Sequence, residues 1–378
     1  MSGTQPSVLV VVEQLRRTVP GGIGTYVRGL LAGLSEIEVD GTVERSIELF
    51  ASRPSATAAG ADPVLDLGRP LRTSRLSSRV LTRAWDLGVA RAPGGFDVVH
   101  GVSLAAPAPR RAGRGRLVVM VHDLAWRTHP GSTTRRGRRW HDAALQRALH
   151  RADAFVVPSL RVRDELVAAG AGASTVTVIA EGADHLPEPD RSGTDAMLRA
   201  FGVEGPYLLS VSTLEPRKNL GRLVEAYRSA RLAMAAPLPL VVAGPLGWGD
   251  PGLDALGQDG VVLVGHVEKA ALAGLYASAA AFVYVPLAEG FGLPPLEAMR
   301  AGAPVLASDA VPSVVEHDGE APALLVDPTD PDAIAAALVA ITSDGALVAR
   351  LRRSGPIFAG MRTWRSTAAG HLALWEAV

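Results

Sequence analysis

The segment from Glu289 to Glu297 combines two carboxylates, two glycines and the start of a predicted helix. It reads Glu-Gly-Phe-Gly-Leu-Pro-Pro-Leu-Glu and follows an apolar, strand-like run. The glycines are expected to leave the N–H groups of Phe291, Gly292 and Leu293 free to bind phosphate oxygens at the start of the helix. A carboxylate accepts hydrogen bonds from two vicinal sugar hydroxyls. This one segment therefore offers ligands for the sugar, phosphate and ribose parts of a single molecule.

Two adjacent cations, Arg217 and Lys218, follow another apolar run at residues 207–211 and precede a predicted helix that begins near Asn219. Cations beside a helix N-terminus are well suited to a diphosphate. The chain has only one other lysine, Lys269, among 38 basic residues. A lysine at this position is therefore unusual for the sequence, and we interpret the pair as a diphosphate clamp.

A glycine-rich segment, Pro20 to Tyr26, lies after the first apolar run and includes Gly22 and Gly24. We expect a loop there, in which backbone N–H groups approach a phosphate or a sugar. As a dinucleotide fingerprint the segment is poor, because Val27 stands where a third glycine is required. A plain tight turn is the alternative interpretation.

His122 and Asp123 come directly after the apolar run at residues 117–121. A histidine at the end of a strand can contact a ligand, although a lone histidine there is more often structural. The sequence assigns no role to Asp123.

Apolar runs alternate with helical stretches along the whole chain. The runs lie at 8–12, 96–99, 117–121, 155–157 and 176–179 in the first half, and at 207–211, 238–243, 261–264, 282–285, 304–307 and 323–326 in the second. This is the rhythm of parallel α/β sheets, whose ligands bind at the carboxyl ends of the strands. We therefore expect an α/β fold with two Rossmann-like domains.

A segment rich in proline and glycine, residues 185–206, divides the two halves. We predict an N-terminal Rossmann-like acceptor domain at 1–185 and a C-terminal Rossmann-like donor domain at 186–362. The last helix, 363–378, is predicted to pack back onto the first domain. A chain of 378 residues is long enough for two such cores.

Composition excludes several classes of protein. The chain has no cysteine, so disulfides and thiol chemistry are absent. The first residues lack the pattern of a signal peptide, and no apolar run approaches the roughly 20 residues that span a bilayer. We therefore expect a cytoplasmic enzyme, acting in solution or at the inner face of the membrane.

Arginines are concentrated in residues 1–185, with clusters at 110–116 and 135–139. These clusters suit contact with anionic lipid or with a phosphorylated acceptor, while a merely solvated face explains them equally well. Aromatic residues do not interleave with the clusters, so we expect no nucleic-acid partner.

Taken together, these motifs resemble the retaining glycosyltransferases of family four. That family's pattern has an N-terminal glycine loop, a histidine after a first-domain strand, an Arg-Lys pair and two glutamates flanking seven residues. The segments at 213–219 and 289–302 look most like a subset rich in polysaccharide and O-antigen mannosyltransferases. The resemblance covers essentially the whole chain and implies the GT-B fold, with a cleft between two Rossmann-like domains.

The resemblance also implies roles for individual residues. Arg217 and Lys218 would neutralise the donor diphosphate, and Glu297 would bind the ribose hydroxyls. Glu289, helped by the backbone of Gly290, Phe291, Gly292 and Leu293, would contact the donor. His122 would lie against the donor sugar, with Gly22 and Gly24 lining the cleft. Residues 178–184 depart from the family's usual Val-Ile-Pro-Asn-Gly-Val-Asp, which affects the linker rather than the chemistry.

The implied function is transfer of a hexosyl group from a nucleotide-diphosphate sugar to a glycan, lipid-linked or small-molecule acceptor. GDP-mannose is the first expected donor, with retention of configuration and no metal or other cofactor. A sugar-nucleotide epimerase or hydrolase of the same fold and a non-catalytic sugar-nucleotide-binding subunit are the alternatives. A pyridoxal-phosphate-dependent phosphorylase is disfavoured, because only Lys218 and Lys269 could form its Schiff base.

Overall fold

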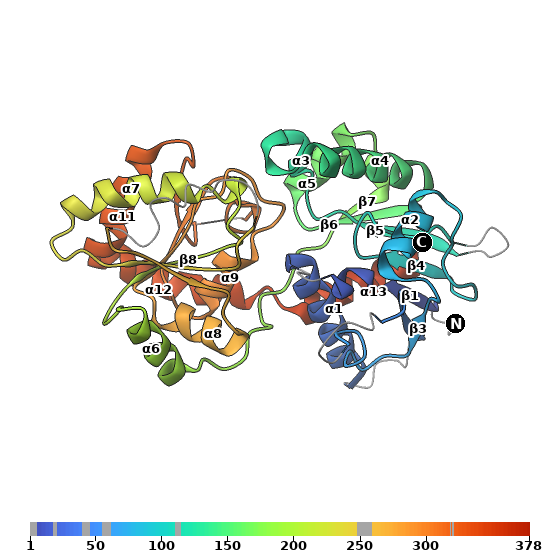
Figure 1. The fold of residues 1–378 in the computed structure, drawn as a ribbon, viewed down its shortest axis with the longest axis horizontal. Coiled ribbons are helices and arrows are strands. Elements are labelled where there is room, and N and C mark those ends of the chain that lie inside the picture. Colours follow the sequence, from blue (N-terminus) through green and yellow to red (C-terminus); the bar gives the residue numbers. More distant parts are fainter. Residues whose placement is uncertain are drawn as a thin grey trace. The chain divides into compact units, whose positions relative to one another are not determined.

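The structure is a computed structural model with two compact units, each built on a parallel β-sheet (Figure 1). It describes residues 6–17, 21–39, 46–54, 62–109, 115–247, 259–317, 319 and 321–378. The first unit contains residues 1–124, 134–182 and 363–378, and the second contains 125–133 and 183–362. The last helix is thus grouped with the first unit.

The sheet of the first unit has seven strands in the order β3-β2-β1-β4-β5-β6-β7. The strands are β1 (Val8–Val11), β2 (Ile47–Ala51), β3 (Leu71–Thr73), β4 (Val98–Gly101), β5 (Arg116–Met120), β6 (Ala154–Val157) and β7 (Val176–Val178). All pair in parallel, and Val8 lies opposite both Ile47 and Val98. The order reverses between β1 and β4, which makes this the switch point of the sheet.

The helices of the first unit lie on its sheet. They are η1 (Glu13–Arg16), α1 (Gly21–Val39), α2 (Ser78–Asp86), α4 (Arg135–Arg151), α5 (Leu160–Ala168), η3 (Ala173–Thr175) and α13 (Trp364–Ala377). Side chains cap three of them at the N-terminus, namely Thr134 for α4, Ser159 for α5 and Thr363 for α13. The C-terminal helix α13 packs against α1 in the core of this unit.

The sheet of the second unit has six parallel strands in the order β10-β9-β8-β11-β12-β13. They are β8 (Leu208–Val211), β9 (Leu240–Ala243), β10 (Val261–Gly265), β11 (Ala281–Tyr284), β12 (Val305–Ser308) and β13 (Leu324–Val326). Its switch point lies between β8 and β11, where Ala281 pairs with Leu208. The Arg-Lys pair follows one of these two strands and Glu289 follows the other.

Helices cover both faces of the second sheet. They are α6 (Arg191–Ala200), η4 (Pro216–Lys218), α7 (Leu220–Ala233), α8 (Lys269–Ser278), α9 (Leu293–Arg300), α10 (Pro312–Val315), α11 (Pro331–Ser343) and α12 (Gly345–Gly360). Two short helices that follow β5, α3 (Ala125–Thr128) and η2 (Pro130–Ser132), are also grouped with the second unit. Successive strand residues belong to different cores: Leu209 and Val241 lie in one, and Leu208 and Leu240 in the other. This alternation follows from the two-residue period of a strand and explains why these strands are apolar throughout.

The predicted α/β fold with two parallel sheets is confirmed. Each predicted run corresponds to an observed strand whose ends are shifted by at most two residues. The sequence analysis missed β2 and β3, because the outer strand β3 is short and carries no buried residue and Glu48 interrupts β2.

One prediction at the N-terminus is wrong. Gly22 and Gly24 do not lie in a loop but in the first turn of α1, which begins at Gly21. Gly22 is exposed and Gly24 is buried. Position 20 and the arginines at 110, 111 and 114 lie outside the described residues.

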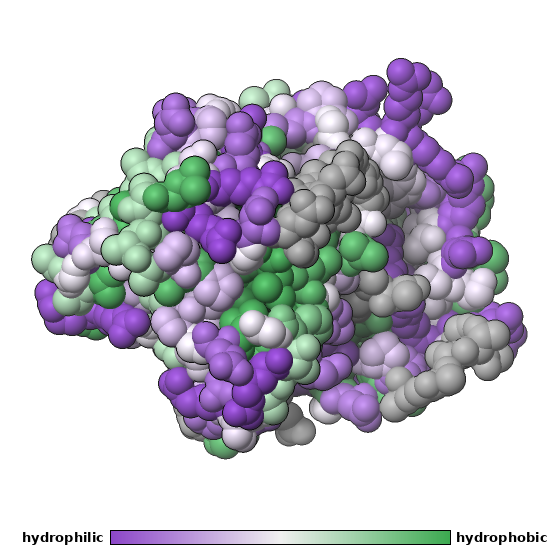
Figure 2. Space-filling model, turned by 60° about the vertical axis from the view of Figure 1, so that its left-hand side comes forward, coloured by the Kyte–Doolittle hydropathy of each residue, from purple (hydrophilic) through white to green (hydrophobic). Residues whose placement is uncertain are grey.

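The face shown in Figure 2 is largely hydrophilic at its outer parts, and hydrophobic residues gather near its middle. Among the described residues no single helix is long and apolar enough to cross a membrane. Two consecutive helical segments, 331–343 and 345–377, are long and apolar enough only when they are taken together, and they are bent by 88° relative to each other.

Candidate functional site

The Arg-Lys pair lies at the carboxyl end of β8, in the short 3-10 helix η4. Asn219 follows in the left-handed conformation, with φ of 61°, and begins α7. Its side-chain amide donates to the backbone oxygens of Val285 (3.0 Å) and Pro328 (2.8 Å). Asparagine tolerates this backbone conformation better than most residues. Asn219 therefore fixes η4 against the end of β11.

Lys218 and Glu289 form an ion pair. Both also bond to the hydroxyl of Tyr284, the last residue of β11. The Lys218 ammonium donates to the Tyr284 hydroxyl (2.9 Å), and this hydroxyl donates to Glu289 Oε1 (2.7 Å). Arg217 approaches the other carboxylate oxygen of Glu289 at 3.2 Å and donates to the Ala288 carbonyl at 2.8 Å. The structure thus joins three predicted site residues in one nearly buried cluster, which we call the Lys218 cluster: Arg217, Lys218, Tyr284 and Glu289.

Burial and the neighbouring charges shift the pKa of Glu289 in opposite directions. Burial alone would raise the pKa of Glu289, but Arg217, Lys218 and the hydrogen bonds from Lys218 and Tyr284 outweigh it and lower this pKa to about 2. Burial and the neighbouring Arg217 lower the pKa of Lys218. Arg217 also pairs with Glu215 at 3.0 Å, so the two nearly buried cations are matched by two carboxylates in this structure.

Glu297 lies on α9, with both carboxylate oxygens held by other residues of the second unit. The Tyr276 hydroxyl donates to Oε2 at 2.8 Å, and His185 Nε2 lies 3.0 Å from Oε1. Burial and the nearby Glu297 raise the pKa of Tyr276 well above its ordinary value. The neutral hydroxyl is therefore a fixed donor that orients the Glu297 carboxylate.

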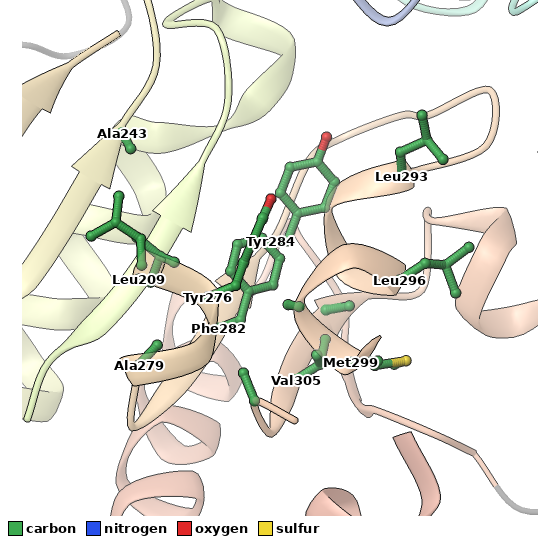
Figure 3. Close-up of a cluster of buried hydrophobic side chains, with 14 of the residues drawn as sticks. Leu209, Ala243, Tyr276, Ala279, Phe282, Tyr284, Leu293, Leu296, Met299 and Val305 are labelled. Atoms are coloured by element: carbon green, nitrogen blue, oxygen red, sulfur yellow. The ribbon is translucent and has the colours of Figure 1, made fainter. Parts of the chain in front are cut away.

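Figure 3 shows how the hydrophobic core supplies the two tyrosine hydroxyls. The rings of Tyr276 and Tyr284 flank Phe282 in one buried cluster, and both hydroxyls point toward the same end of it. One of them contacts Glu289 and the other contacts Glu297. The same aromatic packing therefore positions both predicted carboxylates.

The loop between the carboxylates is held by α10. The N–H of Ser313 donates to the Phe291 carbonyl (2.9 Å), and its hydroxyl donates to the Gly292 carbonyl (2.7 Å). Gly292 has φ of 98°, and a Cβ there would lie 2.4 Å from Val311 Cγ1. Within the described part of the chain, the N–H groups of Phe291, Gly292 and Leu293 donate to no other residue. The loop thus presents backbone donors at the start of α9, as the sequence predicted.

His122 follows β5 in the first unit. Its Nδ1 lies 3.3 Å from a carboxylate oxygen of buried Glu181, and its Nε2 lies 3.0 Å from the Val102 carbonyl. The Tyr26 ring meets the His122 ring edge to face at 5.0 Å. Glu181 lies in the segment that departs from the family's usual sequence, so this chain supplies a carboxylate partner for the predicted histidine.

Tyr26, which contacts His122, also belongs to a series of buried polar contacts that extends to the C-terminal helix α13. The Tyr26 hydroxyl lies 2.7 Å from His371 Nε2 and 3.2 Å from His100 Nε2. His371 Nδ1 lies 2.9 Å from the Thr367 carbonyl, so it donates there and its Nε2 accepts from Tyr26. Burial is the main cause that lowers the pKa of His371, to about 4.

The buried His371 predicts a pH-dependent stability of the first unit. Its pKa is depressed from 6.5 to about 4, so the unfolded chain binds the proton more readily. The contribution is fully present above pH 6.5 and is lost as the pH falls toward 4. From pH 7 to pH 5, we expect wild type to lose about 2 kcal/mol more than His371→Gln. Urea unfolding followed by tryptophan fluorescence measures this difference, and equal losses would contradict it.

Removing one hydroxyl from the second unit tests the orientation of Glu297. Tyr276→Phe deletes a single hydrogen bond to a carboxylate, a loss of about 1.5–3 kcal/mol. We expect nucleotide affinity to fall about tenfold or more. Tyr227→Phe is the matched control, since its hydroxyl donates to the Leu238 carbonyl. Unchanged affinity of Tyr276→Phe in calorimetry would rule out the orienting role.

The structure brings most of the predicted site residues together. Eight of them lie at the carboxyl edge of the second sheet: Arg217, Lys218, Glu289, Gly290, Phe291, Gly292, Leu293 and Glu297. His122, Gly22 and Gly24 lie in the first unit. Sequence reasoning missed Tyr276, Tyr284, His185, Glu181 and Asn219 as partners of these residues. The only available signal was a polar atom at the end of an otherwise apolar run, as in Tyr284.

Comparison with known proteins is consistent with this geometry. The family model "Glycosyltransferase Family 4" matches residues 20–185, and "Glycosyl transferases group 1" matches residues 199–357. The O-antigen chain mannosyltransferase B of Escherichia coli is 32% identical over 61% of this chain and 62% of that protein. The match therefore spans less than two thirds of that relative. The MMP alpha-(1->4)-mannosyltransferase of Mycolicibacterium hassiacum is 28% identical over 97% of both chains.

Solved structures share the fold over nearly the whole chain. HepE from Anabaena, solved with UDP and glucose, has a TM-score of 0.72 and 16% identity, covering 99% of this chain and 100% of that one. Sucrose-phosphate synthase from Thermosynechococcus elongatus has a TM-score of 0.74 and 20% identity, covering 99% of each. The chain thus carries a domain that matches the Glycosyltransferase Family 4 model followed by one that matches the Glycosyl transferases group 1 model, and it belongs to the glycosyltransferases that these two models describe.

Proposed function

We propose that the chain is a retaining glycosyltransferase that moves a mannosyl group from GDP-mannose to a hydroxyl of a glycan or lipid-linked acceptor. The observation that carries this proposal is the Lys218 cluster together with Glu297 and the open N–H groups of Phe291, Gly292 and Leu293. Cations, backbone donors and two carboxylates at a switch point are what a nucleotide-diphosphate sugar needs. The mannosyl donor is supported by the names of the relatives.

In the proposed mechanism, the bond between sugar and diphosphate breaks through an oxocarbenium-like transition state. Negative charge grows on the leaving diphosphate, and Arg217, Lys218 and the loop N–H groups stabilise it. A donor phosphate oxygen takes the proton of the acceptor hydroxyl, which then attacks from the same face of the sugar. Glu289 binds donor-sugar hydroxyls rather than acting as a nucleophile.

Calorimetric titration of the whole chain with GDP, UDP, dTDP and ADP tests the donor site. Each titration is run with and without Mg²⁺, because we propose that the cations replace a metal. We expect selective binding of GDP that Lys218→Ala and Glu297→Ala both weaken. Binding of no nucleotide would contradict the donor site and favour the non-catalytic alternative.

A separate experiment tests the transfer. Incubation with GDP-mannose should release GDP and glycosylate an acceptor, with the anomeric configuration kept in the product. Release of free mannose or a changed sugar nucleotide without acceptor would instead indicate a hydrolase or an epimerase. An inverted product would contradict retention alone.

A further inference from the structure

His185 stands in the segment that begins the second unit, and its backbone is fixed on both sides. Ala183 is buried in the core of this unit, and its N–H donates to the Arg362 carbonyl at 3.0 Å. Leu186, the next residue along, packs against the same core. The His185 side chain is 11% exposed. Because its neighbours are anchored, His185 loses little further conformational freedom when it makes a contact.

The partner of His185 is fixed by the same core. Glu297 lies on α9 between Leu296 and Ala298, and these two side chains are fully buried in the hydrophobic cluster that also contains Ala183. Packing within one cluster therefore sets both ends of the contact between His185 Nε2 and Glu297 Oε1, which are 3.0 Å apart. This contact belongs to the folded second unit and does not depend on two flexible surface side chains.

The charge of Glu297 is compensated differently from that of Glu289. Within the described part of the chain no lysine or arginine pairs with Glu297, whereas two such cations pair with Glu289. Glu297 is nevertheless buried, and a buried carboxylate is costly unless it is paired or hydrogen-bonded. The Tyr276 hydroxyl supplies one hydrogen bond. His185 supplies the other contact, and it is the side chain there that can carry a positive charge.

The two donors to Glu297 leave it able to accept two more hydrogen bonds. A carboxylate has about four lone-pair positions, of which Tyr276 takes one on Oε2 and His185 takes one on Oε1. Since an ionised carboxylate only accepts, His185 Nε2 carries the hydrogen. One acceptor position then remains on each oxygen, which matches a pair of vicinal hydroxyls. His185 and Tyr276 together fix the orientation of the carboxylate plane.

We propose that His185 is a positioning residue for nucleotide recognition, which fixes Oε1 of Glu297 so that binding depends on the ribose hydroxyls. The inference rests on the proposed function, in which Glu297 binds that ribose. Without His185, only the Tyr276 bond holds the carboxylate, which then rotates about this single contact. A site built to bind hydroxyls rejects a ligand that lacks them. Loss of His185 should therefore weaken both the affinity for the nucleotide and this discrimination.

Calorimetry of the full chain with GDP and with dideoxy-GDP, which lacks both ribose hydroxyls, tests the proposal. His185→Phe keeps a ring but removes the donor, and we expect it to weaken GDP binding about tenfold. His185→Gln, whose amide nitrogen has a reach similar to that of Nε2, should restore most of this affinity. Dideoxy-GDP should bind wild type and His185→Phe equally. His150→Phe, exposed on α4 of the first unit, is the matched control and should bind GDP like wild type.

Equal losses of affinity for GDP and dideoxy-GDP in His185→Phe would overturn the proposal, because a general defect of the fold weakens both. The double variant His185→Phe with Glu297→Ala shows whether His185 acts through the carboxylate. It should bind GDP within about twofold of Glu297→Ala alone. A further loss of about tenfold would contradict the positioning role.

The same titrations separate this inference from the proposed function. If wild type binds no nucleotide, the proposed donor site is wrong and the role of His185 falls with it. If wild type binds GDP and Glu297→Ala weakens this binding while His185→Phe does not, the donor site stands and the inference alone is wrong.

Discussion

Replacing Lys218 with alanine is expected to lower kcat about a hundredfold at saturating donor. The ammonium is preorganised by Tyr284 and Glu289 and lies beside Arg217 at the edge where the proposed diphosphate binds. Loss of one such donor to a developing anion costs about 3 kcal/mol in the transition state. Initial rates of GDP release at saturating GDP-mannose measure the effect.

Lys269→Ala is the matched control for this prediction. It removes the only other lysine, which is exposed at the start of α8 in the same unit. We expect its kcat to equal that of wild type. If Lys218→Ala lowers kcat by less than about threefold, the lysine does not stabilise the transition state, because the expected decrease is about a hundredfold. A raised KM with unchanged kcat would limit Lys218 to binding.

The residues at the second switch point could be predicted from sequence because they follow apolar runs directly. Arg217, Lys218 and Glu289 each stand within a few residues of a strand end, and neighbouring parallel strands bring their carboxyl ends together. Their mutual pairing could not be predicted. It depends on the bond from Lys218 to Tyr284 and on the bond from Asn219 to Pro328, which join residues 66 and 109 positions apart.

In the first unit, the sequence located His122 but not the residues around it. The contacts of Tyr26, Glu181 and His371 join segments that are up to 345 positions apart, so no local pattern reports them. The prediction of a loop at Gly22 and Gly24 was wrong for a different, local reason. Glycine usually favours loops over helix interiors, but here α1 starts within the segment itself.

Glu289→Ala is expected to destabilise the second unit by about 3–5 kcal/mol at pH 7, because it removes the carboxylate paired with nearly buried Lys218 and leaves Arg217 with Glu215 as its remaining partner. The lowered pKa of Glu289 implies a stabilisation of similar magnitude. It is lowered from 4.5 to about 2, a stabilisation of about 3 kcal/mol that is present above pH 4.5 and is lost as the pH falls toward 2. Scanning calorimetry measures the loss, with exposed Glu225→Ala on α7 as control.

The pairing itself is tested by the double variant Lys218→Ala with Glu289→Ala. If uncompensated charge causes the loss, the double variant should be more stable than Glu289→Ala alone, since one buried cation has been removed. The same reasoning predicts that GDP stabilises Glu289→Ala more than it stabilises wild type, because the diphosphate then supplies the missing anion. Additive losses and equal stabilisation by GDP would mean that Glu289 contributes through packing, and that the cations do not meet the diphosphate.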